Sequence, residues 1–88
     1  MRLRAYGVTA RIFAERRYHP SQREVEPLAR TTDGEEAVTI EMTVARGRGL
    51  VRFILSWGPE LEVVDPPELR QEVAEAHRRA LARYDRSG

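Results

Sequence analysis

The chain has 88 residues, which is enough for one small domain and too few for an enzyme with separate cofactor and substrate domains. Fifteen arginines and no lysine stand against fourteen acidic residues, and the resulting net charge of +1 lacks the basic excess of a dedicated nucleic-acid binder. With no cysteine there are no disulfides, thiolate nucleophiles or zinc fingers, which favours the cytoplasm. No apolar run is long enough to span a membrane. We predict one domain over residues 1–85 and a disordered tail over 86–88.

The first part of the chain predicts a strand, a helix and a second strand. Residues 2–6 alternate polar and apolar, as a half-buried strand does. Residues 8–17 carry apolar side chains at i, i+4 spacing, which predicts a short helix with Val8 on its apolar side. This helix must end before Pro20, since the residue before a proline avoids the helical region. A second strand is predicted over 23–29.

The middle of the chain predicts a hairpin, a third strand and a second helix. The Asp-Gly pair at 33–34 is typical of a tight turn between antiparallel strands. Residues 38–44 alternate apolar and polar without a break, which makes this the clearest strand. Apolar residues at i, i+3, i+4 and i+7 then predict a helix over 50–57, and the Gly-Pro pair at 58–59 ends it.

The last part predicts a fourth strand followed by a long helix. In residues 60–63, Glu60 and Glu62 alternate with apolar residues and are expected to point away from the core. Asp65 is predicted to be the N-cap of the following helix, with Pro66 at its first position. The helix is expected to continue to residue 85.

This order of elements predicts an α+β domain of the ferredoxin-like βαββαβ type. We expect an antiparallel sheet with strand order 4-1-3-2, two helices on one face, and an additional C-terminal helix. Such a sheet binds RNA through aromatic residues on its open face. Here that face would instead carry Arg2 and Arg4 beside acidic residues, which predicts an ion-paired, solvated surface. We therefore expect no strong direct binding of nucleic acid.

The residues offer little for catalysis. The two histidines, His19 and His77, are far apart in sequence and have no carboxylate at a recognisable spacing, and Ser21 and Ser56 lack the glycines of a nucleophile elbow. We predict a protein that is not an enzyme, with no catalytic residues, no metal site and no cofactor.

One local cluster has the chemistry of an anion site. Arg46, Arg48 and Arg52 surround two glycines before and within the predicted second helix. Cations at a helix N-terminus oppose the helix dipole, so their placement makes sense if an anion binds there with the free backbone N–H groups. The alternative is a solvated loop in an arginine-rich protein, and no phosphate-loop motif decides between them.

The C-terminal helix carries a long apolar stripe. Its spacing predicts that the helix covers a sheet edge, contacts a partner, or does both. We expect the distal part to lie outside its own domain and to contact a second copy or the rest of a larger protein. The candidate interface residues are Leu69, Val73, Ala80, Leu81 and Tyr84.

Two longer motifs in the chain resemble a known family. The first includes Arg17, His19, Pro20, Ser21 and Gln22, and the second includes Trp57, Gly58 and Pro59 and continues to about residue 70. Together they resemble the C-terminal extension (WCX) domain of bacterial WYL-domain transcriptional regulators. The resemblance extends over about residues 2–84.

The resemblance implies a regulatory and assembly role. In such regulators a helix-turn-helix domain binds DNA, a WYL domain senses an effector, and this extension helps pair the protomers and frame the effector site. It implies the WYL and helix-turn-helix domains of a parent regulator as partners, a homodimer, and a nucleic-acid or anionic effector. Neither of those two domains is in this sequence, so the chain resembles either an excised fragment or a stand-alone relative. The alternative function is a small ligand-binding domain with an anion at the arginine cluster.

Overall fold

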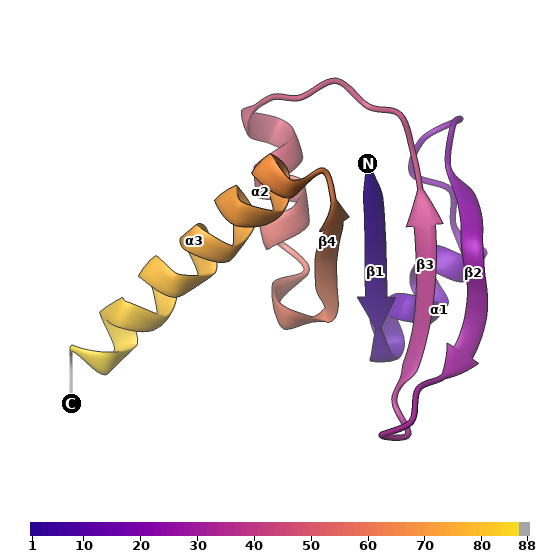
Figure 1. The fold of residues 1–88 in the computed structure, drawn as a ribbon, viewed down its shortest axis with the longest axis horizontal. Helices are drawn as coiled ribbons and strands as arrows, with labels where there is room; N and C mark the ends of the chain where they lie inside the picture. Colours follow the sequence, from indigo (N-terminus) through magenta and orange to yellow (C-terminus); the bar gives the residue numbers. More distant parts are fainter. Residues whose placement is uncertain (87–88) are drawn as a thin grey trace.

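The computed structural model describes residues 1–86 and shows a four-stranded antiparallel sheet with helices packed against it (Figure 1). Its elements are β1 (Arg2–Tyr6), α1 (Gly7–Glu15), β2 (Arg23–Arg30), β3 (Glu36–Glu41), α2 (Arg48–Leu55), the 3-10 turn η1 (Gly58–Glu60), β4 (Leu61–Asp65) and α3 (Pro67–Asp85). The expected order of strands and helices is confirmed.

The sheet has the order β2-β3-β1-β4, which is the predicted order 4-1-3-2 seen from the other edge. In β1, Leu3 lies opposite Ile40 of β3 on one side and Val63 of β4 on the other. All three side chains are buried, so this register brings alternate residues of three strands into one core. The predicted alternation of residues 2–6 is confirmed.

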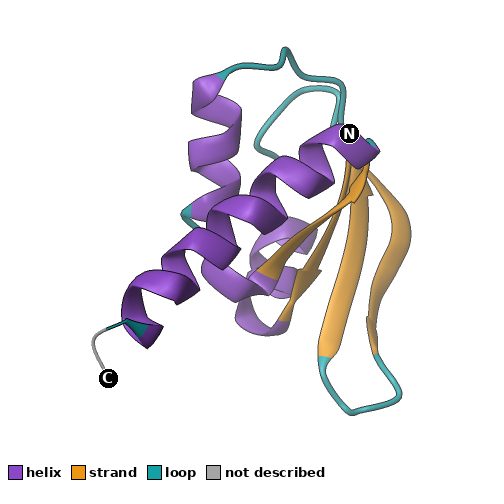
Figure 2. Cartoon of the chain, turned by 60° about the vertical axis from the view of Figure 1, so that its left-hand side comes forward, coloured by secondary structure: helices purple, strands orange, loops and turns teal. Residues whose placement is uncertain are grey.

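The helices cover one side of the sheet and one of its edges. Figure 2 shows α1 and α2 on the same side of the sheet, with α3 beside the β4 edge. Phe13 of α1, Ile54 of α2 and Leu69 of α3 are each buried in the core that also holds the strand residues. Of the placements that the sequence left open for the C-terminal helix, the one along a sheet edge is observed, and α3 packs against β4 and α2.

Three predictions about the first half need correction. The first helix covers 7–15 rather than 8–17. Val8, expected on the packed side of α1, has 69 % of its surface exposed, because the helix buries Thr9, Ala10 and Phe13 instead. The third strand covers 36–41 rather than 38–44. It ends early because the backbone N–H of Thr43 donates to the hydroxyl of Ser21, at 2.8 Å, in place of a neighbouring strand.

The segment around residues 55–60 also differs from the prediction. The second helix ends at Leu55 instead of 57, and a 3-10 turn precedes β4. Glu60 belongs to this turn and does not join the open face of the sheet. Its carboxylate accepts a hydrogen bond of 2.6 Å from the hydroxyl of Thr9 in the first turn of α1. An acidic group is favourable there because the N-terminal end of a helix carries partial positive charge.

The start of α3 lies one residue later than predicted. Asp65 is the last residue of β4, and Pro66 occupies the N-cap position in an extended conformation. The reason is Pro67, which forces the residue before it out of the helical region and is itself well suited to the first helical position. At the other end, Arg86 is the C-cap of α3 and not part of a tail. Residues 87–88 lie outside the described part of the chain.

Candidate functional site

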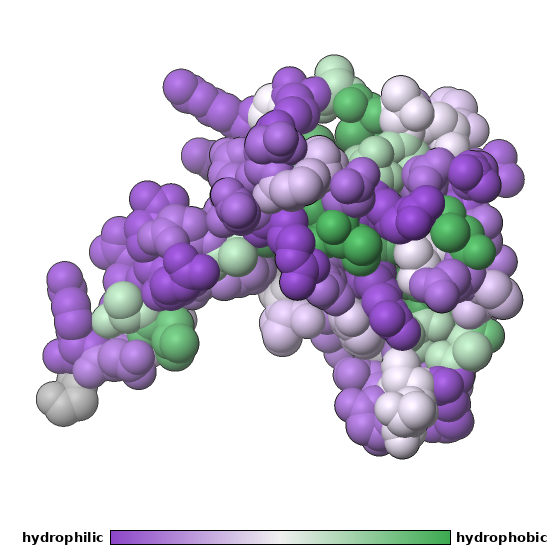
Figure 3. Space-filling view, in the orientation of Figure 1, coloured by the Kyte–Doolittle hydropathy of each residue, from purple (hydrophilic) through white to green (hydrophobic). Residues whose placement is uncertain are grey.

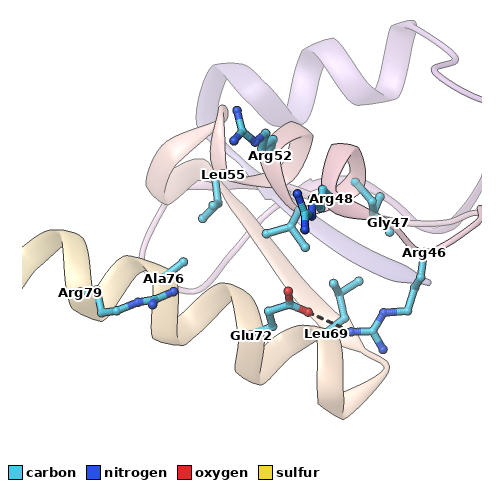
Figure 4. Close-up of a pocket in the computed structure, with 11 residues that line it drawn as sticks. Arg46, Gly47, Arg48, Arg52, Leu55, Leu69, Glu72, Ala76 and Arg79 are labelled. Carbon is cyan, nitrogen blue, oxygen red and sulfur yellow. Dashed lines mark hydrogen bonds and ion pairs between the residues drawn. The ribbon is translucent and has the colours of Figure 1, made fainter.

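A hollow with a volume of about 640 Å³ lies between α2 and α3 (Figure 4). We call it the α2–α3 groove. Its charged rim consists of Arg46, Arg48, Arg52, Arg79 and Glu72. Its apolar floor consists of Leu50, Val51, Leu55, Leu69 and Ala76. The groove thus combines four cations and one anion with a hydrocarbon surface.

All three arginines of the predicted cluster line this groove. Because α2 begins at Arg48, that residue occupies the first helical turn, and Arg46 precedes the helix. Arg46 forms an ion pair with Glu72 of α3, with 3.0 Å between nitrogen and oxygen. Within residues 1–86, neither Arg48 nor Arg52 forms an ion pair, and Figure 4 shows Arg52 directed away from Arg48.

Arg79 and Glu72 are the two rim residues that were not predicted from the sequence. Arg79 is the cation of the two. It comes from α3, 27 residues after Arg52 in the chain, and it also lacks an ion pair within the described residues. The signal that could have found it is the spacing of Leu69, Glu72, Ala76 and Arg79, which places one face of α3 against α2. Arg79 and Arg48 therefore approach the groove from two different helices.

The apolar stripe of α3 divides into a buried and an exposed part. Leu69 and Val73 are 1 % and 4 % exposed, which corrects their assignment to an interface, because they fill the core of their own domain. Ala80, Leu81 and Tyr84, which we call the distal stripe, are exposed, Leu81 to 59 % and Tyr84 to 78 %. Figure 3 shows hydrophobic atoms near the far end of this helix among hydrophilic ones.

A second groove, of about 460 Å³, lies on the other side of α3, toward β4. Apolar residues from η1, β4 and α3 dominate its lining, and His77 of α3 borders it. Leu81 follows His77 by four residues and so lies on the same side of the helix. This β4–α3 groove and the distal stripe therefore occupy neighbouring parts of one side of α3.

The two sequence motifs meet in an aromatic cluster. Tyr18 from the first motif lies 5.9 Å from Trp57 of the second, measured between ring centroids, and 4.9 Å from Phe13. Phe53 of α2 completes the cluster, at 5.6 Å from Tyr18. Tilted and edge-to-face pairs of this kind add about 0.5–1.5 kcal/mol each beyond burial. The motif residues thus join α1, α2 and the loop between α1 and β2.

A comparison with protein-family models decides the family. The model of the WCX domain matches residues 2–81 of the chain. The chain belongs to the WCX family. This family is associated with WYL-domain regulators, as the motifs indicated. No curated protein and no solved structure matches the chain.

In this WCX domain, Ser21 and Gln22 of the first motif make specific contacts. The buried Gln22 side chain donates to the carbonyls of Phe13 and Arg16, at 3.2 and 3.0 Å, and accepts from the N–H of Tyr18 at 2.8 Å. The hydroxyl of Ser21 lies 2.8 Å from Nδ1 of His19 and joins this loop to the end of β3.

The other motif residues have simpler roles. Arg17 is exposed and forms no ion pair within residues 1–86. Pro20 lies in the turn between α1 and β2, and Pro59 lies in η1. Gly58 has a φ of +61°, in the left-handed region that side chains disfavour. The backbone conformation between α2 and η1 therefore favours a glycine at this position of the second motif.

The open face of the sheet is ion-paired, as predicted, with two exceptions. One is Arg4, and the other is Thr39 of β3, which is 4 % exposed rather than solvated and donates to Glu26 at 2.7 Å. Glu41 accepts from Arg2 and Arg23 at 2.9 and 2.7 Å, and Arg70 of α3 pairs with Glu62 at 2.7 Å. Arg4 forms no ion pair within the described residues, and its guanidinium lies 5.6 Å from the centre of the Tyr6 ring. Strand β3 carries no aromatic residue on which a base could stack.

The hydroxyl of Tyr6 donates to Glu62 at 2.5 Å, which gives this face a pH-sensitive contact. Burial, followed by the hydrogen bond to Glu62, raises the pKa of Tyr6 to about 12. Burial acts to raise the pKa of Glu62 as well, but the hydrogen bonds from Tyr6 and Arg70 outweigh it and lower that pKa.

The Tyr6–Glu62 contact should therefore stabilise the fold at neutral pH. Tyr6→Phe is expected to lower the free energy of unfolding by about 1 kcal/mol, which is below the roughly 1.5–3 kcal/mol of a hydrogen bond to a charged group because the pair is partly solvated. Since the folded-state pKa of Tyr6 lies above its unfolded value of about 10, the difference should be complete below pH 10 and shrink as the pH rises toward 12. Urea unfolding of both proteins across this range measures it. A difference that stays constant from pH 7 to 12 would contradict the prediction.

Other classes of site lack support in the described residues. No group of three or more histidine, aspartate or glutamate side chains within residues 1–86 could hold a metal ion. No helix in the same range has the length and apolarity needed to cross a bilayer.

Proposed function

We propose that this WCX domain is a non-catalytic regulatory and assembly module of a WYL-type bacterial transcriptional regulator. It would act in the cytoplasm, without a cofactor, by helping to pair protomers and by relaying the state of an effector to a DNA-binding domain elsewhere in the regulator. Its strand order and helix-covered face support a ferredoxin-like fold. Its partners would be the WYL and helix-turn-helix domains and a second copy of the chain.

The observation that carries this proposal is the length of α3 beyond its own domain. Only Leu69 and Val73 of its 19 residues are buried. From Arg78 onward every described residue of the helix is exposed, and Figure 1 shows this part extending away from the sheet. These last turns therefore bury no residue in the core of their own domain, although most helical stability in proteins comes from tertiary packing. Contact with another domain or chain would supply the missing stabilisation.

The position of α3 also suggests how a signal could pass through the domain. One side of the helix contributes Glu72, Ala76 and Arg79 to the α2–α3 groove. Another side carries the β4–α3 groove and the distal stripe. Any ligand or partner that shifts α3 at one of these surfaces therefore acts on the same rigid helix that forms the other.

The distal stripe gives a direct test of the assembly role. We expect the 88-residue chain to self-associate with rising concentration in light scattering, and Leu81→Glu to shift association to at least tenfold higher concentration by placing a charge on the stripe. Ala82→Glu adds the same charge at the next exposed position, off the stripe, and should associate like the parent. Because Leu81 is largely exposed, its substitution should change the stability of the monomer by no more than about 0.5 kcal/mol.

Two results would contradict this assignment. If the parent remains a monomer at every concentration, the distal stripe does not pair copies of this chain. If Leu81→Glu is a monomer like the parent but loses much of its stability, α3 serves only its own domain.

A second candidate function is anion binding in the α2–α3 groove. The observation that favours it is that Arg48, Arg52 and Arg79 all line one hollow, each without an ion pair within residues 1–86. Uncompensated like charges repel, so an anion in the groove would stabilise the domain. We propose no strong direct binding of duplex nucleic acid, because the net charge is small and β3 carries no aromatic residue on which a base could stack.

A further inference from the structure

The α2–α3 groove presents two different chemical surfaces to one ligand. Its floor residues Leu50, Val51 and Leu55 are only partly buried, although they are aliphatic. Guanidinium groups stand above this floor from both helices, and Figure 4 shows Arg48 and Arg79 on opposite sides of the hollow. An inorganic anion would contact the arginines and leave the aliphatic floor in water.

The arginines of the rim differ in whether their charge is free to bind a ligand. Arg46 is already neutralised by Glu72 at 3.0 Å. Arg48 and Arg79 have no such partner within residues 1–86. An anionic group bound between α2 and α3 would meet these two unpaired arginines, whereas a long polyanion following the groove would also pass the carboxylate of Glu72. The rim therefore favours a ligand with one compact charge.

From these observations we propose that the groove binds a small organic anion with an apolar body and one carboxylate or phosphate head group. The head group is held by Arg48 and Arg79, and the apolar body lies on Leu50, Val51 and Leu55. The volume of about 640 Å³ lies within the range of about 300–1,000 Å³ that is usual for small-molecule sites. This proposal rests on the anion-binding candidate above and adds the class of ligand.

The test compares ligands that share one part of this chemistry. Octyl phosphate and octanoate carry both an apolar chain and an anionic head, inorganic phosphate lacks the chain, and octanol lacks the charge. Each is titrated into the 88-residue chain below its micelle concentration by calorimetry, and the thermal midpoint is followed in parallel, since a ligand of the folded state raises it by mass action. We expect at least tenfold tighter binding of octyl phosphate or octanoate than of inorganic phosphate or octanol. Comparing the two amphiphiles identifies the preferred head group.

Substitutions of residues that line the groove test whether the ligand binds there. Arg48→Ala and Arg79→Ala should each weaken the amphiphile about tenfold or more, because each removes a charge-assisted contact. Leu55→Ala should weaken the amphiphile and leave the weak response to inorganic phosphate unchanged. The matched control is Arg78→Ala, which removes the same charge from the same helix at a residue that pairs with Glu75 and lies outside the groove. It should bind like the parent.

The possible outcomes distinguish the proposed class of ligand from the simpler proposal that the groove binds an anion. If octyl phosphate and inorganic phosphate bind equally and both need Arg48 and Arg79, the anion site stands and the apolar ligand class is wrong. If octanol binds as well as octyl phosphate, or if Arg78→Ala weakens binding as much as Arg79→Ala, the arginines do not recognise a head group and the proposal is overturned. If none of the four ligands binds, both the anion site and the ligand class fall.

Discussion

Phe13→Ala is expected to lower the free energy of unfolding by about 3–5 kcal/mol, the usual loss for a buried phenylalanine. The ring is 1 % exposed and lies 4.9, 6.4 and 5.1 Å from the rings of Tyr18, Phe53 and Trp57. Its removal leaves a cavity where α1, α2 and both family motifs meet. A domain of this size has only about 4–13 kcal/mol of stability in total, so this one substitution should remove a large fraction of it.

A matched variant separates cavity formation from a general effect of mutation at this position. Phe13→Leu keeps most of the apolar volume and should cost about 1.5 kcal/mol. Denaturant unfolding at 25 °C, followed by circular dichroism and by the fluorescence of Trp57, measures both variants. Equal losses for alanine and leucine would show that the aromatic cluster does not depend on the bulk of Phe13.

The sheet could be predicted from the sequence because most of its strands show one local pattern, the alternation of apolar and polar residues. In β3, Val38 and Ile40 are buried on the helix-covered side, and the alternation of apolar and polar residues that predicts this is local in sequence, although Ala37 and Thr39 on the other side are buried as well. Once the four strands and their connections are known, the handedness and length of the connections leave few arrangements, and the observed order is among them. The Asp-Gly turn fixed the hairpin between β2 and β3, where the N–H of Gly34 donates to the carbonyl of Thr31 at 3.0 Å.

The errors in the fold arose where a distant contact overrides a local pattern. Glu60 fits an alternating strand by sequence, but the Thr9 hydroxyl, 51 residues away, holds its carboxylate at the start of α1. Thr43 likewise fits the third strand, but Ser21 takes its backbone N–H. Neither partner is visible from the spacing of neighbouring residues. Element ends are therefore less predictable than the elements themselves.

The candidate groove was predictable only in the part that one segment contributes. Arg46, Arg48 and Arg52 lie within seven consecutive residues, so the sequence displays them as a cluster. Arg79 and Glu72 join them only because α3 crosses α2. The ion pair of Arg46 with Glu72 changes the meaning of the cluster, since it leaves Arg48 and Arg79 as the cations available to a ligand.

The motif around Gln22 had no assigned role from sequence, and the structure gives it one. The Gln22 side chain is 7 % exposed and bonds to backbone groups of Phe13, Arg16 and Tyr18, on both sides of the point where α1 ends. The last carbonyls of a helix have no partner within the helix, so they need one from outside. Gln22 supplies it and at the same time fixes the loop that carries Tyr18.

Gln22→Ala is accordingly expected to lower the free energy of unfolding by about 2–3 kcal/mol, because it leaves buried backbone groups without partners. Gln22→Met keeps the length and most of the volume of the side chain but cannot form the three hydrogen bonds. If the hydrogen bonds carry the stabilisation, methionine should restore less than half of the loss caused by alanine. Ser21→Ala, at an exposed neighbouring position, should cost about 1 kcal/mol or less. Urea unfolding of the three variants decides the matter: if methionine at position 22 restores the parent stability, Gln22 acts by filling space, and its contacts with the end of α1 do not stabilise the fold.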